Sequence, residues 1–126
     1  MENKKYILSP LNKTWILDLD GTILKHNGYK IDNKDTFLEG AYEFLVQIPL
    51  DDMVIFLTSR TEKWKKPTED FLKQNNIRYN SIIFNVPYGE RILINDCKPS
   101  GLPMTLAINT TRDIFMGNKF EINLNL

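Results

Sequence analysis

Two aspartates, Asp18 and Asp20, stand two positions apart in the stretch "WILDLDGTIL", directly after an apolar run. Residues two apart on an extended chain project to the same side, so both carboxylates would enter one small space. Like charges at that separation repel one another unless a cation lies between them. Oxygen ligands without a His or Cys cluster suit Mg²⁺ better than Zn²⁺. The pair therefore predicts a site for Mg²⁺.

Other polar residues also follow apolar runs. Thr58, Ser59 and Arg60 come after "MVIFL", and Asp96 comes after "RILIN". In open α/β sheets, ligands bind beyond the carboxyl ends of the strands. We therefore expect these residues to meet the two aspartates at one edge of a sheet.

These residue types predict phosphoryl transfer. A carboxylate can attack phosphorus and form an acyl phosphate that water then cleaves. In such a site Asp18 would attack, while Asp20 would protonate the leaving oxygen and later deprotonate water. Gly21 would let the chain turn sharply and present backbone N–H groups to phosphate oxygens. Thr58 would hydrogen-bond the transferring group.

Five short apolar runs predict the strands that must position these residues. They begin at Trp15, Met53, Ser81, Arg91 and Met104. Each run is continuous rather than alternating, which is typical of strands buried on both faces of a parallel sheet.

Two helices are expected between the strands. Helical spacing of apolar residues predicts one over 36–48, ended by Pro49. Pro67 in a first turn, with Asn75 and Asn76 as a C-cap, predicts the second. The alternation of strands and helices predicts an α/β fold with a mostly parallel sheet.

Two parts of this pattern leave alternatives open. Only "NVPYGE" separates "SIIF" from "RILIND", whereas a parallel crossover normally takes roughly a dozen residues. The run at Ser81 is therefore either a short edge strand or is joined to the next strand by an extended bridge. The tail 120–126 alternates weakly, and it is either an added edge strand or a contact with another subunit.

The motifs resemble those of the haloacid dehalogenase-like (HAD) phosphatases. "DLDGTI" is similar to the first motif, "FLTSR" to the second and "LINDCKP" to the acidic motif on the fourth strand. The resemblance covers 15–109 and implies a Rossmann-like three-layer sandwich with a central sheet of about five strands. It also implies that Asp18 is the nucleophile and Asp20 the acid/base. Mg²⁺ would be held by Asp18, the Asp20 carbonyl and Asp96, with Thr58 on the phosphate.

The chain departs from the family pattern at two positions. The family usually has paired acids at the fourth strand, whereas Cys97 follows Asp96, so a second acid is missing or replaced by water. The lysine of the third motif has two candidates, Arg91 and Lys98. Arginine keeps its charge and can bind phosphate bidentately, and we favour Arg91 for its place upstream of the fourth strand.

The chain has no room for the cap domain that related phosphatases insert, so the resemblance implies a capless member. Its open site would be covered by a large substrate or by a neighbouring subunit of a homo-oligomer. Similar capless proteins act on sugar phosphates of envelope polysaccharide pathways or on nucleic-acid 3′-phosphate ends. We expect a small phosphomonoester of the first kind, a sugar phosphate or nucleotide-sugar intermediate. Its expected contacts are Gly21, Ser59, Arg60, Tyr29 and Lys30.

Composition limits the function classes. Sixteen basic residues balance sixteen acidic ones without a basic stripe, which argues against a polynucleotide substrate. No apolar stretch approaches the roughly 20 residues that span a bilayer, and no secretion-signal pattern is present, so we expect a cytoplasmic protein without a membrane partner. The length predicts a single domain over 1–126, with a core at about 13–110 and an extension over 111–126.

Two other classes share this fold and its chemistry. A phospho-accepting receiver domain carries its phosphorylated aspartate at the third strand, and no acid ends "SIIFNV". A catalytically silent binding module would not need Asp18, Asp20, Thr58 and Asp96, although the missing acid at Cys97 keeps that alternative open. Metal-dependent turnover would separate the enzyme from the module.

Overall fold

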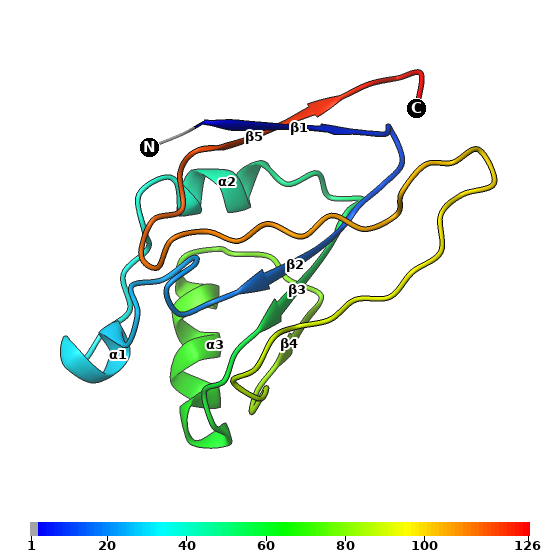
Figure 1. Cartoon of the computed structure of the whole chain (residues 1–126). Helices are drawn as coiled ribbons and strands as arrows, with labels where there is room; N and C mark the ends of the chain where they lie inside the picture. Colours follow the sequence, from blue (N-terminus) through cyan, green and yellow to red (C-terminus); the bar gives the residue numbers. More distant parts are fainter. Residues whose placement is uncertain (1–2) are drawn as a thin grey trace.

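The computed structural model describes residues 3–126, and a three-stranded parallel sheet lies at its centre (Figure 1). The strands are β2 (Thr14–Asp18), β3 (Met53–Leu57) and β4 (Ser81–Ile83), in the spatial order β2-β3-β4. Asp18 at the end of β2 pairs with Leu57 at the end of β3. The predicted α/β class with parallel pairing is confirmed, and β4 is a short edge strand.

The described residues form four helical segments: α1 (Gly28–Ile31), α2 (Ala41–Gln47), the 3₁₀ turn η1 (Glu62–Trp64) and α3 (Lys65–Gln74). The first predicted helix is shorter than expected, because α2 begins only after Gly40. Gly40 adopts φ 81°, and a Cβ there would lie 2.8 Å from Met116 Cγ, so this position requires glycine. The helix ends at Ile48, which is extended as expected for a residue before proline.

The second predicted helix is confirmed as α3. Pro67 lies in its first turn, where a missing N–H costs no helical hydrogen bond. Asn75 is the C-cap, and Asn76 follows in the left-handed region with φ 57°. These residues end the helix as the sequence predicted.

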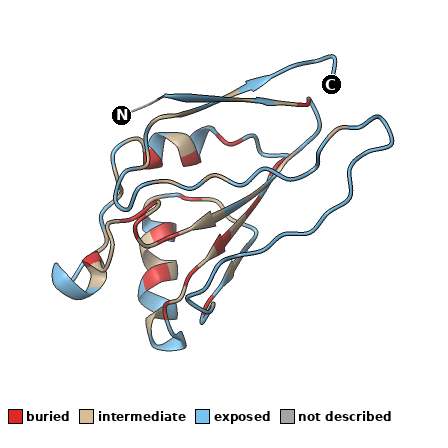
Figure 2. Cartoon of the chain, viewed as in Figure 1, coloured by how far each residue is buried: buried red, intermediate tan, exposed pale blue. Residues whose placement is uncertain are grey.

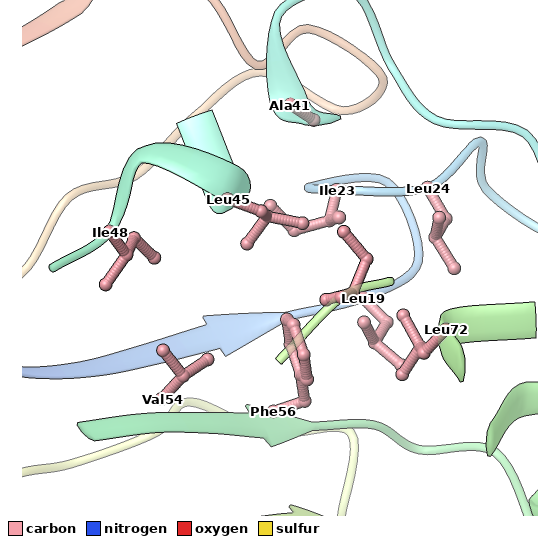
Figure 3. Close-up of a cluster of buried hydrophobic side chains, with 10 residues drawn as sticks. Leu19, Ile23, Leu24, Ala41, Leu45, Ile48, Val54, Phe56 and Leu72 are labelled. Carbon is pink, nitrogen blue, oxygen red and sulfur yellow. The ribbon is translucent and has the colours of Figure 1, made fainter. Parts of the chain in front are cut away.

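The hydrophobic core lies between β3, α2, α3 and the turn after β2 (Figure 3). Its most deeply buried side chains are Leu19, Ile23, Leu24, Ala41, Val54, Phe56 and Leu72. Val54 and Phe56 face this core, whereas Met53 on the other face of β3 is 45% exposed and Ile16 of β2 is 46% exposed. The strands are therefore buried mainly on one face, and the expectation of burial on both faces was wrong. Figure 2 shows that buried residues gather in the central strands and in α3, whereas the long segment after β4 is exposed.

A second sheet joins the two ends of the described chain. β1 (Lys4–Leu8) pairs in parallel with β5 (Asn118–Ile122). Phe120 of β5 contacts the Trp15 ring at a centroid distance of 5.1 Å and the Phe44 ring at 6.1 Å, which joins this sheet to the core. The tail is thus a strand, although its partner is β1 and not the central sheet.

The runs at Arg91 and Met104 are not strands, so the expected single sheet of five strands is wrong for these segments. Ile92 and Ile94 are 82% and 90% exposed in an extended segment that leaves the sheet after β4 (Figure 1). The stretch 84–90 contains no helix and is too short for a parallel crossover. Within 3–126, no helix combines the length and apolar character needed to cross a bilayer.

Candidate active site at the carboxyl end of strand β2

The Asp18 carboxylate, on the last residue of β2, accepts two hydrogen bonds. Thr22 Oγ1 donates to Asp18 Oδ2 at 3.0 Å, and Arg91 Nη1 donates to Oδ1 at 3.0 Å. Leu19 is fully buried in the core, so chain alternation turns the two flanking aspartates away from it. The Asp18 side chain is 31% exposed, which leaves a lone pair accessible to a ligand.

Gly21 makes the sharp turn predicted after the strand, with φ 84°. A side chain at this position would be strained by the backbone conformation. The N–H of Gly21 donates to the Leu24 carbonyl at 2.7 Å, and the N–H groups of residues 22–24 donate to the Leu19 carbonyl. The turn's N–H groups are therefore used internally, and the prediction that they present themselves to phosphate does not agree with this geometry.

Thr58 follows β3 and is fully buried. Its Oγ1 accepts a hydrogen bond from the Arg60 backbone N–H at 3.1 Å. Ser59 is half-buried at the same sheet edge. The structure thus brings Thr58 and Ser59 to the sheet edge that carries the aspartates. The Thr58 hydroxyl oxygen is already bonded there to a backbone N–H of the protein.

Arg60 connects Asp20 to a third carboxylate, Asp35. Arg60 Nε and Nη2 donate to the two oxygens of Asp20 at 3.0 and 2.9 Å. Nη1 and Nη2 donate to the two oxygens of Asp35 at 3.0 and 2.7 Å, and Nη1 also donates to Thr68 Oγ1 at 2.9 Å. These bonds account for the five N–H donors of a guanidinium. We call Asp20, Arg60 and Asp35 the arginine clamp.

The clamp is buried and carries two carboxylates against one cation. The side chains of Arg60 and Asp35 are 1% and 6% exposed, whereas that of Asp20 is 17% exposed. Burial disfavours the charged guanidinium, but hydrogen bonds with Asp35 and Asp20 outweigh this effect, and the pKa of Arg60 lies above its ordinary value. Arg60 therefore stays charged, and its donors face carboxylates rather than a substrate.

Tyr29 of α1 covers the clamp. Its ring centroid lies 3.9 Å from Arg60 Cζ, a stacked cation–π arrangement. Trp64 of η1 packs against Tyr29 edge to face, with ring centroids 4.6 Å apart. Lys30 Nζ lies 5.5 Å from the Tyr29 centroid on the exposed side. Of the two predicted substrate contacts in this loop, Tyr29 packs on Arg60 and Lys30 is exposed.

The structure separates the two candidates for the third-motif cation. Arg91 donates to Asp18, as described above, and its side chain is 36% exposed. Lys98 is exposed, and its backbone forms a local turn with Leu102. Arg91 is thus the candidate that lies beside Asp18.

The predicted metal ligands are only partly brought together. Asp18 and Asp20 flank Leu19 at one strand end, but Asp96 is exposed in the segment that leaves the sheet, and its carboxylate accepts a hydrogen bond from the neighbouring Asn95 Nδ2 at 3.4 Å. Among residues 3–126, no group of three or more His, Cys, Asp or Glu side chains is placed to hold a metal ion. The structure thus brings Asp18 and Asp20 to one strand end and leaves Asp96 apart from them.

Sequence reasoning did not find Asp35. It belongs to no motif and meets Arg60 only through the fold, across 25 positions of the chain. The one available signal was an arginine directly after a buried strand, since a buried guanidinium needs carboxylate partners. A pocket of about 470 Å³ lies beside α3, and none of the predicted site residues lines it.

Comparisons with models of known protein families, with characterised proteins and with solved structures find no match to this chain.

Proposed function

We propose that the chain is a phosphomonoester hydrolase that acts through a phospho-aspartate at Asp18. The observation that carries the proposal is the hydrogen bond from Arg91 Nη1 to Asp18 Oδ1 beside Asp20. A guanidinium in this position keeps further donors for the oxygens of a phosphate bound over Asp18. Nucleophile, acid/base and anion-binding cation then occupy one strand end.

The first step is attack by an Asp18 carboxylate oxygen on phosphorus. The ester P–O bond breaks, and the leaving oxygen takes the proton of Asp20, so the alcohol departs neutral. Arg91 balances negative charge on the phosphoryl oxygens as it transfers. The product of this step is an aspartyl phosphate and a deprotonated Asp20.

The second step returns the enzyme to its initial state. Asp20 accepts a proton from water as the water oxygen attacks the aspartyl phosphate. The P–O bond to Asp18 breaks, which releases inorganic phosphate and regenerates the Asp18 carboxylate. Asp20 is again protonated and ready for the next substrate.

Mg²⁺ is the cofactor that the resemblance to HAD phosphatases implies, and it is part of the proposal. Asp18 and the Asp20 carbonyl are its expected ligands, with Asp96 as the third. The exposed position of Asp96 makes the metal requirement a point for direct measurement. The finer fold, a Rossmann-like three-layer sandwich of the capless HAD type, is proposed on the same resemblance.

The substrate we propose is a small phosphorylated metabolite, such as a sugar phosphate or nucleotide-sugar intermediate of a surface polysaccharide pathway. Support comes from the balanced charge, which offers no general attraction to a polynucleotide. Partial exposure of Asp18 agrees with an open site that a substrate or a neighbouring subunit covers.

The test is phosphate release from sugar phosphates, nucleotides and oligonucleotide 3′-phosphates, with Mg²⁺ and with chelator. We expect Mg²⁺-dependent release from the native protein, at least roughly 10³-fold less from Asp18→Asn, and no change in Asp70→Asn. Asp70 is a matched control because it forms an exposed ion pair with Lys66 on α3. Turnover that survives in Asp18→Asn would contradict the proposal.

A catalytically silent binding module is the second candidate. It is favoured by the separation of Asp96 from the other acids and by the ion pairs that already neutralise Asp18 and Asp20. Phosphate-ester binding without turnover at any Mg²⁺ concentration would support the module over the enzyme.

A further inference from the structure

We propose that Asp35 is a positioning residue that acts through Arg60 to fix the carboxylate of Asp20 for proton transfer. The inference rests on the proposed function. It adds Asp35, which no motif assigns to the reaction, and it changes the expected role of Arg60 from a substrate contact to a link between two carboxylates. Asp20 would remain the group that touches the substrate, and Asp35 would act only through the arginine between them.

The geometry of the arginine clamp supports this role. Arg60 binds both oxygens of Asp20, so the carboxylate cannot rotate without breaking a hydrogen bond of 2.9 or 3.0 Å. Asp35 binds the opposite side of the same guanidinium through both of its oxygens. The guanidinium of Arg60 is planar, and carboxylates bind it on two sides, so its orientation is fixed. Its two hydrogen bonds to Asp20 then fix the orientation of that carboxylate.

Burial is graded along the clamp in the direction expected for this role. Asp35 and Arg60 are almost fully buried, while the Asp20 side chain is 17% exposed. Tyr29 covers the guanidinium and Thr68 takes its remaining N–H. The buried Arg60 and Asp35 therefore support Asp20, the one residue of the clamp that reaches solvent. The leaving oxygen of a substrate would lie beside Asp20.

A structural ion pair alone would not place its accessible carboxylate beside the nucleophile position. Asp20 follows Asp18 by two positions, and each has its own arginine, Arg60 and Arg91. The two arginines make different contacts: Arg91 leaves donors for a phosphate, whereas Arg60 uses all of its donors within the protein. These contacts suit Arg91 to binding the phosphate and Arg60 to orienting the acid, Asp20.

The test compares two aryl esters of nearly the same shape, phenyl phosphate and 4-nitrophenyl phosphate. The hydroxyl of phenol has a pKa near 10, about that of the tyrosine side chain, so the leaving phenolate oxygen needs a proton from the enzyme. The 4-nitrophenolate ion is a much weaker base and leaves without a proton. In Asp35→Asn, the amide places N–H groups against an Arg60 donor, so the clamp must shift. We expect kcat/KM, which reports the first step, to fall about tenfold more for phenyl phosphate than for 4-nitrophenyl phosphate, because the second step is common to both esters.

Two further variants separate positioning from a loss of stability. Asp52→Asn removes another buried carboxylate, which bonds only Lys13 N–H and Trp15 Nε1 at the far end of β2. It should leave both rates per folded molecule, and therefore their ratio, at the native level. Asp35→Glu keeps the carboxylate and should return the ratio of the two rates toward the native value, which also covers the case in which Asp35→Asn fails to fold.

A second readout follows the clamp without turnover. The Arg60 Nε–H resonance, identified by its loss in Arg60→Lys, should shift or broaden in Asp35→Asn and stay unchanged in Asp52→Asn. Equal losses on both esters, or an unchanged Arg60 resonance, would overturn the role of Asp35 while leaving the phosphatase intact. A native protein inactive toward every ester would overturn the proposed function and this role with it.

Discussion

The two ends of strand β2 use the same residue type in different ways. At its amino end, the buried Asp52 accepts hydrogen bonds from Lys13 N–H at 3.0 Å and Trp15 Nε1 at 2.9 Å. At its carboxyl end, Asp18 and Asp20 each meet an arginine, and Asp35 joins the second of them. At the amino end, neutral donors complete the hydrogen bonds of one carboxylate. At the carboxyl end, three carboxylates surround two arginines.

The difference teaches that burial of an acid does not by itself mark a functional site. Asp52 is 5% exposed and closes the connection into β3, a structural role that two neutral donors complete. The carboxyl end instead holds carboxylates that remain partly exposed beside fixed positive charge. Accessible carboxylates beside fixed positive charges are the features on which the proposed attack on phosphorus depends.

After Asp18→Asn, the largest expected effect at the carboxyl end is that of Asp20→Asn. The amide cannot donate or accept the transferred proton, so kcat/KM for an alkyl or phenyl ester, which reports the first step, should fall about 10²- to 10⁴-fold. Steady-state kinetics on the phenyl and 4-nitrophenyl esters measure this, and the phenyl ester should lose more. An equal loss on both would mean that Asp20 does not act as the acid.

Arg91→Met should have an intermediate effect. Loss of a charge-assisted hydrogen bond to the transferring group should lower kcat/KM about 10- to 100-fold, while Arg91→Lys should keep part of the activity. Because both partners of the Arg91–Asp18 pair are about one third exposed, the free energy of unfolding should change by less than about 1 kcal/mol. Parallel kinetics and urea denaturation check both numbers, and a large loss of stability would assign Arg91 a structural role.

The smallest effect on activity is expected at the amino end of β2. Asp52→Asn leaves a buried donor facing an amide N–H group, so the free energy of unfolding should fall by about 1–3 kcal/mol. Activity per folded molecule should stay at the native level. Denaturant unfolding alongside phosphate release tests this, and a drop in kcat with unchanged stability would contradict the comparison between the two ends.

Much of the central fold could be predicted from local sequence. β2, β3 and α3 follow from apolar runs and cap residues that act within a few positions. The run at Arg91 has three consecutive aliphatic residues but forms no strand, because a strand also needs a partner and a connection long enough to reach it. The start of α2 was misplaced because Gly40 is required by a contact with Met116, which is distant in sequence.

Some residues of the candidate site could likewise be predicted from local sequence, and others could not. Asp18, Asp20 and Thr58 were predicted together because strand ends share an edge, and the structure agrees. The partners of Arg60 were not predictable, since its fork fits a substrate phosphate as well as two carboxylates. Only the fold, which brings Asp35 to it, decides between these partners.

The pairing of β1 with β5 has a consequence for the order of folding. Lys4 pairs with Asn118, so these strands cannot meet until almost the whole described chain has been synthesised. Closing so long a loop costs entropy before any hydrogen bond forms, and a two-stranded ribbon is marginally stable alone. Docking of Phe120 on Trp15 therefore has to stabilise the pair, and we expect this sheet to form last and to open first.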